Sequence, residues 1–126
     1  MKLSENQIIF SYNIACLTLY ANSKGIGFTY GEAERTKEQQ LLYFYGYTLI
    51  VINGELKLVK TDKKSKTLNS NHLRRLAVDF NFFMDGKLLK DEKLLQDLGN
   101  YWCSLHAKNR WGGNWGWDKP HFEMNV

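Results

Sequence analysis

The sequence predicts an α+β fold in which about three helices pack on a small antiparallel sheet, in a single domain spanning residues 1–126. Two long stretches repeat apolar residues at helical spacing. Between them, short segments alternate apolar and polar residues or flank an Asn-Gly turn, which is typical of antiparallel strands. With 126 residues, 44% of them hydrophobic, the chain has the size and composition of one domain with its own core.

The first helix is predicted over residues 4–23, because Ser4-Glu5-Asn6-Gln7 has the form of a capping box. Gly25 and Gly27 end it, and residues 26–33 are expected to be extended. Apolar or small side chains recur along the helix at spacings of three and four: Ile8, Ile9, Tyr12, Ala15, Cys16, Leu19 and Tyr20.

A second capping box, Thr36-Lys37-Glu38-Gln39, predicts a short helix over residues 40–45 that Gly46 closes. Asn53-Gly54 then separates two apolar runs, which predicts a β-hairpin. The runs are Leu49–Ile52 and Leu56–Val59.

Residues 76–84 alternate in polarity and are predicted to form a strand that Asp85-Gly86 turns. A third helix is expected over residues 91–107, and residues 121–124 are expected to form a last short strand. The side chains that should point inward from the third helix are Leu94, Leu95, Leu98, Tyr101, Trp102 and Leu105.

Composition narrows the classes of function. No stretch approaches the roughly 20 apolar residues of a membrane span, and the first residues do not resemble a signal peptide. We therefore expect synthesis in the cytosol and no membrane insertion.

The net charge of +4 owes much to lysines between residues 57 and 66, a run that is either a solvated loop or an attractor of polyanions. Cys16 and Cys103 are expected to be buried thiols.

Two of the three histidines lie near carboxylates. In "SNHLRRLAVDF", a regular helix or strand would separate His72 from Asp79 by roughly 10 or 23 Å. Ligands of one metal lie within about 3–4 Å of each other, since zinc bonds are near 2 Å. If both residues bind one metal, the chain must bend, with His72 on a loop and Asp79 on the following strand. The third histidine, His106, is expected to be a surface or helix-capping residue.

The run "DKPHFE" contains the second candidate histidine. Pro120 excludes a helix interior, so Asp118 should lie in a turn that leads into a strand. His121 and Glu123 would share one face of that strand, while Phe122 points into the core. Two histidines and one carboxylate form a catalytic zinc pattern, and a further carboxylate could act as general base. The same ligand set also occurs in non-haem iron oxygenases.

These residues resemble the zinc peptidases that cut bacterial cell-wall peptides, the D-alanyl-D-alanine carboxypeptidase and L-alanyl-D-glutamate endopeptidase family. The signature S-x-H-x-x-G-x-A-x-D is matched from Ser70 to Asp79, with Arg75 at the glycine position. The second signature of the family is an acidic residue, two further residues, a histidine and then an aromatic residue. Asp118, His121 and Phe122 match it. Residues 35–40, Arg-Thr-Lys-Glu-Gln-Gln, match a third element of the family.

The resemblance implies a role for each matching residue. His72, Asp79 and His121 would bind Zn²⁺, and Asp118 would be the general base. Arg35 would bind a substrate carboxylate or stabilise the oxyanion. Ser70, Gln39 and Trp115 are expected to contact the substrate. Glu123 is expected to orient one of the ligand histidines. Trp111, Trp115 and Trp117 could wall a substrate groove or pack on the core.

The function implied is hydrolysis of an amide bond in peptidoglycan stem peptides. The short basic chain resembles phage or prophage endolysins, which accumulate in the cytoplasm and act on the cell wall once the membrane is opened. That resemblance favours hydrolysis of the L-alanyl-D-glutamate bond. We expect the enzyme to be a monomer that binds peptidoglycan and no nucleic acid. The alternatives are D-alanyl-D-alanine carboxypeptidase activity and a non-catalytic cell-wall-binding relative. A nucleic-acid binder would leave both histidine motifs unexplained.

Overall fold

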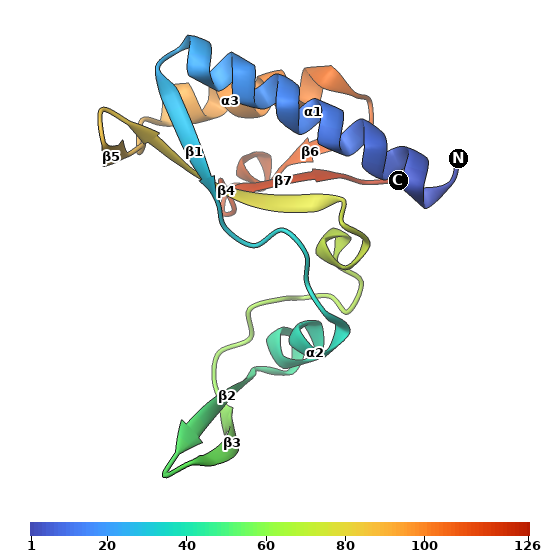
Figure 1. Ribbon diagram of the computed structural model, residues 1–126, viewed down its shortest axis with the longest axis vertical. Coiled ribbons are helices and arrows are strands. Elements are labelled where there is room, and N and C mark those ends of the chain that lie inside the picture. Colours follow the sequence, from blue (N-terminus) through green and yellow to red (C-terminus); the bar gives the residue numbers. More distant parts are fainter.

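Two layers form the body of the protein, whose computed structural model describes residues 1–126. Helices α1 (Leu3–Ser23) and α3 (Glu92–Leu105) cover one face of an antiparallel sheet (Figure 1). The sheet order is β1-β4-β7-β6, and the short strand β5 (Lys87–Leu88) pairs with the end of β4. Those four strands are β1 (Ile26–Tyr30), β4 (Ala77–Met84), β7 (His121–Met124) and β6 (Asn109–Trp111). The predicted α+β class is confirmed.

The core lies between the two helices and the sheet. Phe10 of α1 and Trp102 of α3 meet edge to face, with ring centroids 5.5 Å apart. Trp102 also packs on Phe122 of β7, and its indole N–H donates to the carbonyl of Glu123 at 3.1 Å. Because the buried indole finds a backbone acceptor, α3 is fixed to the central strand without leaving a polar group unsatisfied.

The register of β4 against β7 positions the candidate ligands. Asp79 lies opposite His121 and Val78 lies opposite Phe122. Side chains alternate between faces along a strand, so burying Val78 and Phe122 in the core turns Asp79 and His121 to the face that the helices leave open.

An arm projects from that open face (Figure 1). It consists of α2 (Lys37–Tyr45) and a hairpin of β2 (Tyr47–Ile52) and β3 (Glu55–Lys60), which form a separate two-stranded sheet. Asn53 and Gly54 both have positive φ, as the hairpin turn requires. The chain then returns to a short 3₁₀ helix, η1 (Asn71–Arg74).

The structure departs from the sequence-based prediction in local detail. Helix α1 begins at Leu3, and the carboxylate of Glu5 accepts from the backbone N–H of Lys2, so the cap lies two residues before Ser4. Strand β6 and the 3₁₀ helix η2 (Gly112–Trp115) were not predicted. Both cysteines are free and partly buried. None of the helices has the length and apolar character needed to span a bilayer.

Candidate active site

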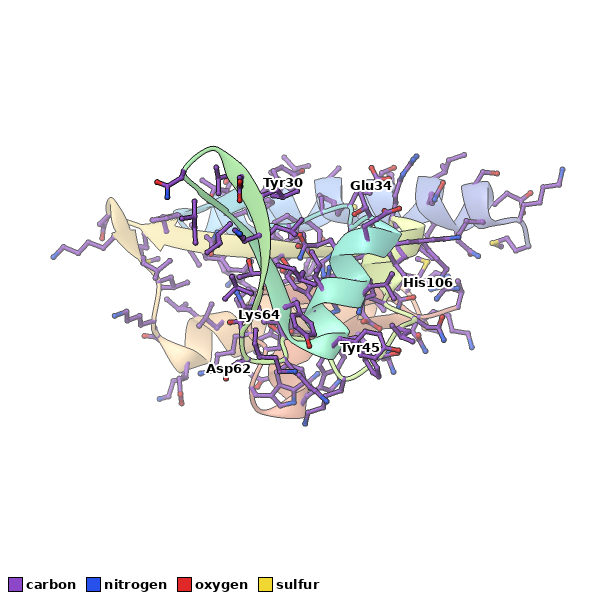
Figure 2. All side chains as sticks on the ribbon, turned by 90° about the horizontal axis from the view of Figure 1, so that it is seen from below. Tyr30, Glu34, Tyr45, Asp62, Lys64 and His106 are labelled. Atoms are coloured by element: carbon purple, nitrogen blue, oxygen red, sulfur yellow. The ribbon has the colours of Figure 1, made fainter.

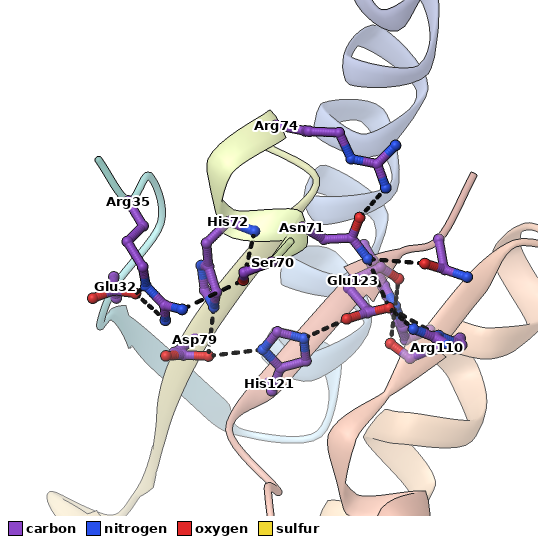
Figure 3. Close-up of polar contacts among 12 residues, drawn as sticks. Glu32, Arg35, Ser70, Asn71, His72, Arg74, Asp79, Arg110, His121 and Glu123 are labelled. Atoms are coloured by element: carbon purple, nitrogen blue, oxygen red, sulfur yellow. Dashed lines mark hydrogen bonds and ion pairs between the residues drawn. The ribbon is translucent and has the colours of Figure 1, made fainter. Parts of the chain in front are cut away.

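His72, Asp79 and His121 converge on the open face of the sheet (Figure 3). Oδ1 of Asp79 lies 3.6 Å from Nε2 of His72 and 3.3 Å from Nδ1 of His121. One ligand atom from each residue lies within 4.8 Å of the other two. The bend expected between His72 and Asp79 is the 3₁₀ helix η1, followed by Arg75 in the left-handed conformation.

The second nitrogen of each imidazole ring is held by an acceptor. Nδ1 of His72 lies 3.0 Å from the carbonyl oxygen of Ala33, and Nε2 of His121 lies 2.7 Å from Oε1 of Glu123. A carbonyl or carboxylate only accepts, so these two nitrogens carry the protons. The nitrogens that face Asp79 are then the ones available to a cation. Two imidazoles and one carboxylate, with their outer nitrogens bonded in this way, fit Zn²⁺.

Charge at the cluster favours the ionised carboxylates. Burial alone would raise the pKa of Asp79, but hydrogen bonds from His121 and His72 outweigh it and hold that pKa well below its usual range. Burial would lower the pKa of His121, yet Asp79 and Glu123 raise it to about 9. The pKa of Glu123 is lowered because hydrogen bonds from His121 and Arg110 outweigh its burial. The cluster is therefore a site built to hold positive charge.

Asp118 lies at the rim of the same cluster, in a cavity of about 720 Å³. Burial raises its pKa, although the nearby His121 opposes this. The carbonyl of Asp118 accepts from the backbone N–H of His121 at 3.1 Å, which ties the loop to the start of β7. Gly112 allows this packing, because a Cβ there would lie 2.1 Å from the Asp118 carbonyl oxygen.

Arg35 reaches the cavity from the segment before α2. Its guanidinium pairs with Glu32, donates to Oε1 of Gln40 at 2.8 Å and to Oγ of Ser70 at 3.4 Å, and lies over the ring of Tyr43. Its backbone N–H donates to the carbonyl of His72 at 3.2 Å. Arg35 and Ser70 both line the cavity, beside the two histidines.

The tryptophans divide between core and cavity. Trp111 is buried and its indole N–H donates to the carbonyl of Lys119 at 2.7 Å. Trp115 and Trp117 line the cavity, and the Trp115 ring lies 5.3 Å from that of His121. His106 follows the last residue of α3, and its Nδ1 accepts from the backbone N–H of Lys108 in the turn after the helix.

Gln39 departs from its expected place. It borders a different, smaller cavity, and its backbone N–H donates to Oγ1 of Thr36, the residue that caps α2. The neighbouring Gln40, which is buried, contacts Arg35 instead, because one residue along a helix rotates the side chain by about 100°. Sequence reasoning also did not place Lys63, Lys64 and Lys66 in the cavity wall, because their run could be either a solvated loop or an attractor of polyanions.

Comparison with known proteins now decides the family. Residues 63–124, about half of the chain, match the family model of D-alanyl-D-alanine carboxypeptidases. This chain belongs to that family of peptidases. The matched segment includes His72, Asp79, Asp118 and His121.

The fold of the peptidase is also found among solved structures. It resembles the crystal structure of the Serratia marcescens L-Ala D-Glu endopeptidase ChiX, with a TM-score of 0.54 and 22% sequence identity. The alignment covers 79% of this chain and 68% of that one. No curated protein matches the peptidase by sequence.

Proposed function

We propose that the protein is a zinc metallopeptidase that hydrolyses an amide bond in peptidoglycan stem peptides. The observation that carries this proposal is the convergence of one ligand atom each from His72, Asp79 and His121 within 4.8 Å, in a cavity that Asp118 and Arg35 also line. A site for structural zinc is normally closed by four protein ligands, whereas three ligands beside a cavity leave room for substrate.

The residues around the ligands divide the remaining work. Zinc bound there would lower the pKa of a water molecule and polarise the amide carbonyl. Asp118 accepts the proton of the attacking water, a role for which its raised pKa suits it. Arg35, held by Glu32 and Gln40, presents its guanidinium to a substrate carboxylate or to the developing oxyanion. Ser70 and Trp115 contact the bound peptide beside it.

We propose that the enzyme cuts the L-alanyl-D-glutamate bond. We further propose that it is a monomer of phage or prophage origin that acts at the cell wall. The fold shared with an L-Ala D-Glu endopeptidase supports this choice. The second candidate is D,D-carboxypeptidase activity, which the description of the matching family model favours.

Mass spectrometry of defined muropeptides separates the two activities. The zinc-loaded protein should release a fragment with a new N-terminal D-Glu, and the same protein with Asp118→Asn should release none. Release of terminal D-Ala would assign the carboxypeptidase activity instead. Intact muropeptides after incubation with zinc-loaded protein would overturn both.

A further inference from the structure

The chain segment Lys63–Thr67, which we term the lysine strap, forms part of the cavity wall with Arg35 and Ser70. Figure 2, viewed from the side of the arm, labels Asp62 and Lys64 where the chain leaves the hairpin. The side chains of Lys63, Lys64 and Lys66 are exposed, and no carboxylate forms an ion pair with any of them. Three ammonium groups at the cavity therefore lack an anionic partner within the protein.

The backbone of the lysine strap is fixed to α2. Nε2 of the buried Gln40 donates to Oγ of Ser65 at 2.8 Å and to the carbonyl of Thr67 at 2.6 Å. The backbone N–H groups of Lys64 and Ser65 both donate to the carbonyl of Tyr43. A solvated loop needs no such anchors. The strap is therefore preorganised, which lowers the entropy lost when a ligand binds its side chains.

Gln40 also joins the strap to the candidate catalytic residues. While its Nε2 holds the strap, its Oε1 accepts from the guanidinium of Arg35. One buried side chain thus sets the position of Arg35 relative to the strap. The charge of Arg35 is offset by Glu32, whereas the three lysine charges are not offset. The unpaired positive charge at the cavity is complementary to a ligand that carries carboxylates.

Resting on the proposed function, we propose that Lys63, Lys64 and Lys66 form a subsite for a free carboxylate next to the bond that is cut. In a stem peptide, D-Glu is joined onward through its side-chain carboxyl, so its α-carboxylate remains free on the carbon that carries the scissile nitrogen. Converting this carboxylate to a carboxamide removes the charge with little change of shape. The lysine strap therefore makes the enzyme select stem peptides with free carboxylates over amidated ones.

Two synthetic stem peptides test the subsite, identical except that the α-carboxyl of D-Glu is free in one and amidated in the other. Pairs of exposed charges each contribute about two- to fivefold, so wild-type kcat/KM should be roughly tenfold higher for the free peptide. Replacing Lys63, Lys64 and Lys66 together by Gln should remove this preference, mainly by raising KM for the free peptide to that of the amidated one.

A second triple variant controls for net charge. Lys87, Lys90 and Lys108 are exposed and lie outside the cavity wall, so their joint replacement by Gln lowers the charge equally and should keep the preference. Equal wild-type rates on both peptides, or loss of preference in the control variant as well, would overturn the subsite. Cleavage of neither peptide by zinc-loaded wild type would instead overturn the proposed function and, with it, the inference.

Discussion

Glu123 fixes the ring of His121 from two residues away on the same strand face, through a bond of 2.7 Å from Nε2 of the histidine. Glu123 is itself buried and also receives the guanidinium of Arg110 and the amide of Asn71. The carboxylate therefore cannot swing away, and Nδ1 of His121 is held facing Asp79. Orientation of this kind by a carboxylate that is not a ligand strengthens metal binding by histidine.

Replacing Glu123 by Gln should weaken zinc binding by about 10- to 100-fold, because the acceptor that orients His121 loses its charge. A competition titration with a chromogenic chelator measures the affinity. Arg110→Gln is the matched control, since it leaves the bond between Glu123 and His121 in place and should have a smaller effect. Equal affinities of Glu123→Gln and wild type would remove Glu123 from the metal site.

Asp118→Asn should retain zinc and lower turnover by about 10²- to 10⁴-fold, the usual contribution of a general base. The amide has nearly the shape of the carboxylate but cannot accept a proton at neutral pH. Turnover on the preferred muropeptide and zinc content should be measured on the same preparation. Undiminished turnover would show that another group is the base. Glu123 is the next candidate by sequence, but it is buried and already bonded to His121 and Arg110.

Arg35→Ala should lower kcat/KM by about 10²- to 10³-fold, as expected for a group that stabilises developing negative charge. Zinc content should be unchanged because Arg35 supplies no ligand. The substitution also leaves Glu32 without its ion pair, so thermal unfolding must show that the variant is folded at the assay temperature. A folded Arg35→Ala variant with wild-type kinetics would show that Arg35 has only a structural role, as the partner of an ion pair.

Arg75 stands where the family signature has glycine, and it adopts φ 56° and ψ 37° at the end of η1. This left-handed conformation destabilises the folded state by roughly 1–2 kcal/mol for a residue that has a side chain. Glycine avoids that strain, but its more flexible unfolded state offsets part of the gain in stability. Arg75→Gly should therefore raise the free energy of unfolding by up to about 1 kcal/mol and leave zinc binding intact.

Chemical denaturation of Arg75→Gly and Arg75→Ala separates strain from charge. Both variants lose the exposed ion pair with Glu34, which contributes little, but only glycine relieves the backbone. If the alanine variant is more stable than the glycine variant, the strain of the left-handed conformation is smaller than the entropic cost of glycine, and the prediction is wrong.

The placement of Asp118, His121 and Glu123 could be predicted from the sequence because local rules decide it. Pro120 excludes a helix, and the alternation of a strand then separates Phe122 from its neighbours. Asn53-Gly54 predicted the hairpin for a similar reason, since few residues other than these accept positive φ at both turn positions.

Long-range contacts decide what could not be predicted. Strand β6 has three residues and exists because it pairs with β7, a pairing that no local pattern reveals. The choice between Gln39 and Gln40 depends on which side of α2 faces Arg35. The sequence leaves the strap lysines either a solvated loop or an attractor of polyanions, and only the contacts of Gln40 and Tyr43 place them at the cavity.

The strand that ends the chain is central in the sheet. Strand β7 lies between β4 and β6, with Phe122 and Met124 fully buried. Truncation before His121 would remove a central strand and unfold the protein, so it cannot separate loss of metal from loss of fold. Single substitutions at the ligands are the sharper test.

The zinc content of purified wild type, His72→Ala and His121→Ala, measured by atomic mass spectrometry, tests the central claim most directly. One zinc per wild-type chain is predicted, and each variant should lose it while remaining folded by circular dichroism. Full retention of zinc by both variants would show that these histidines do not bind the metal and would contradict the account.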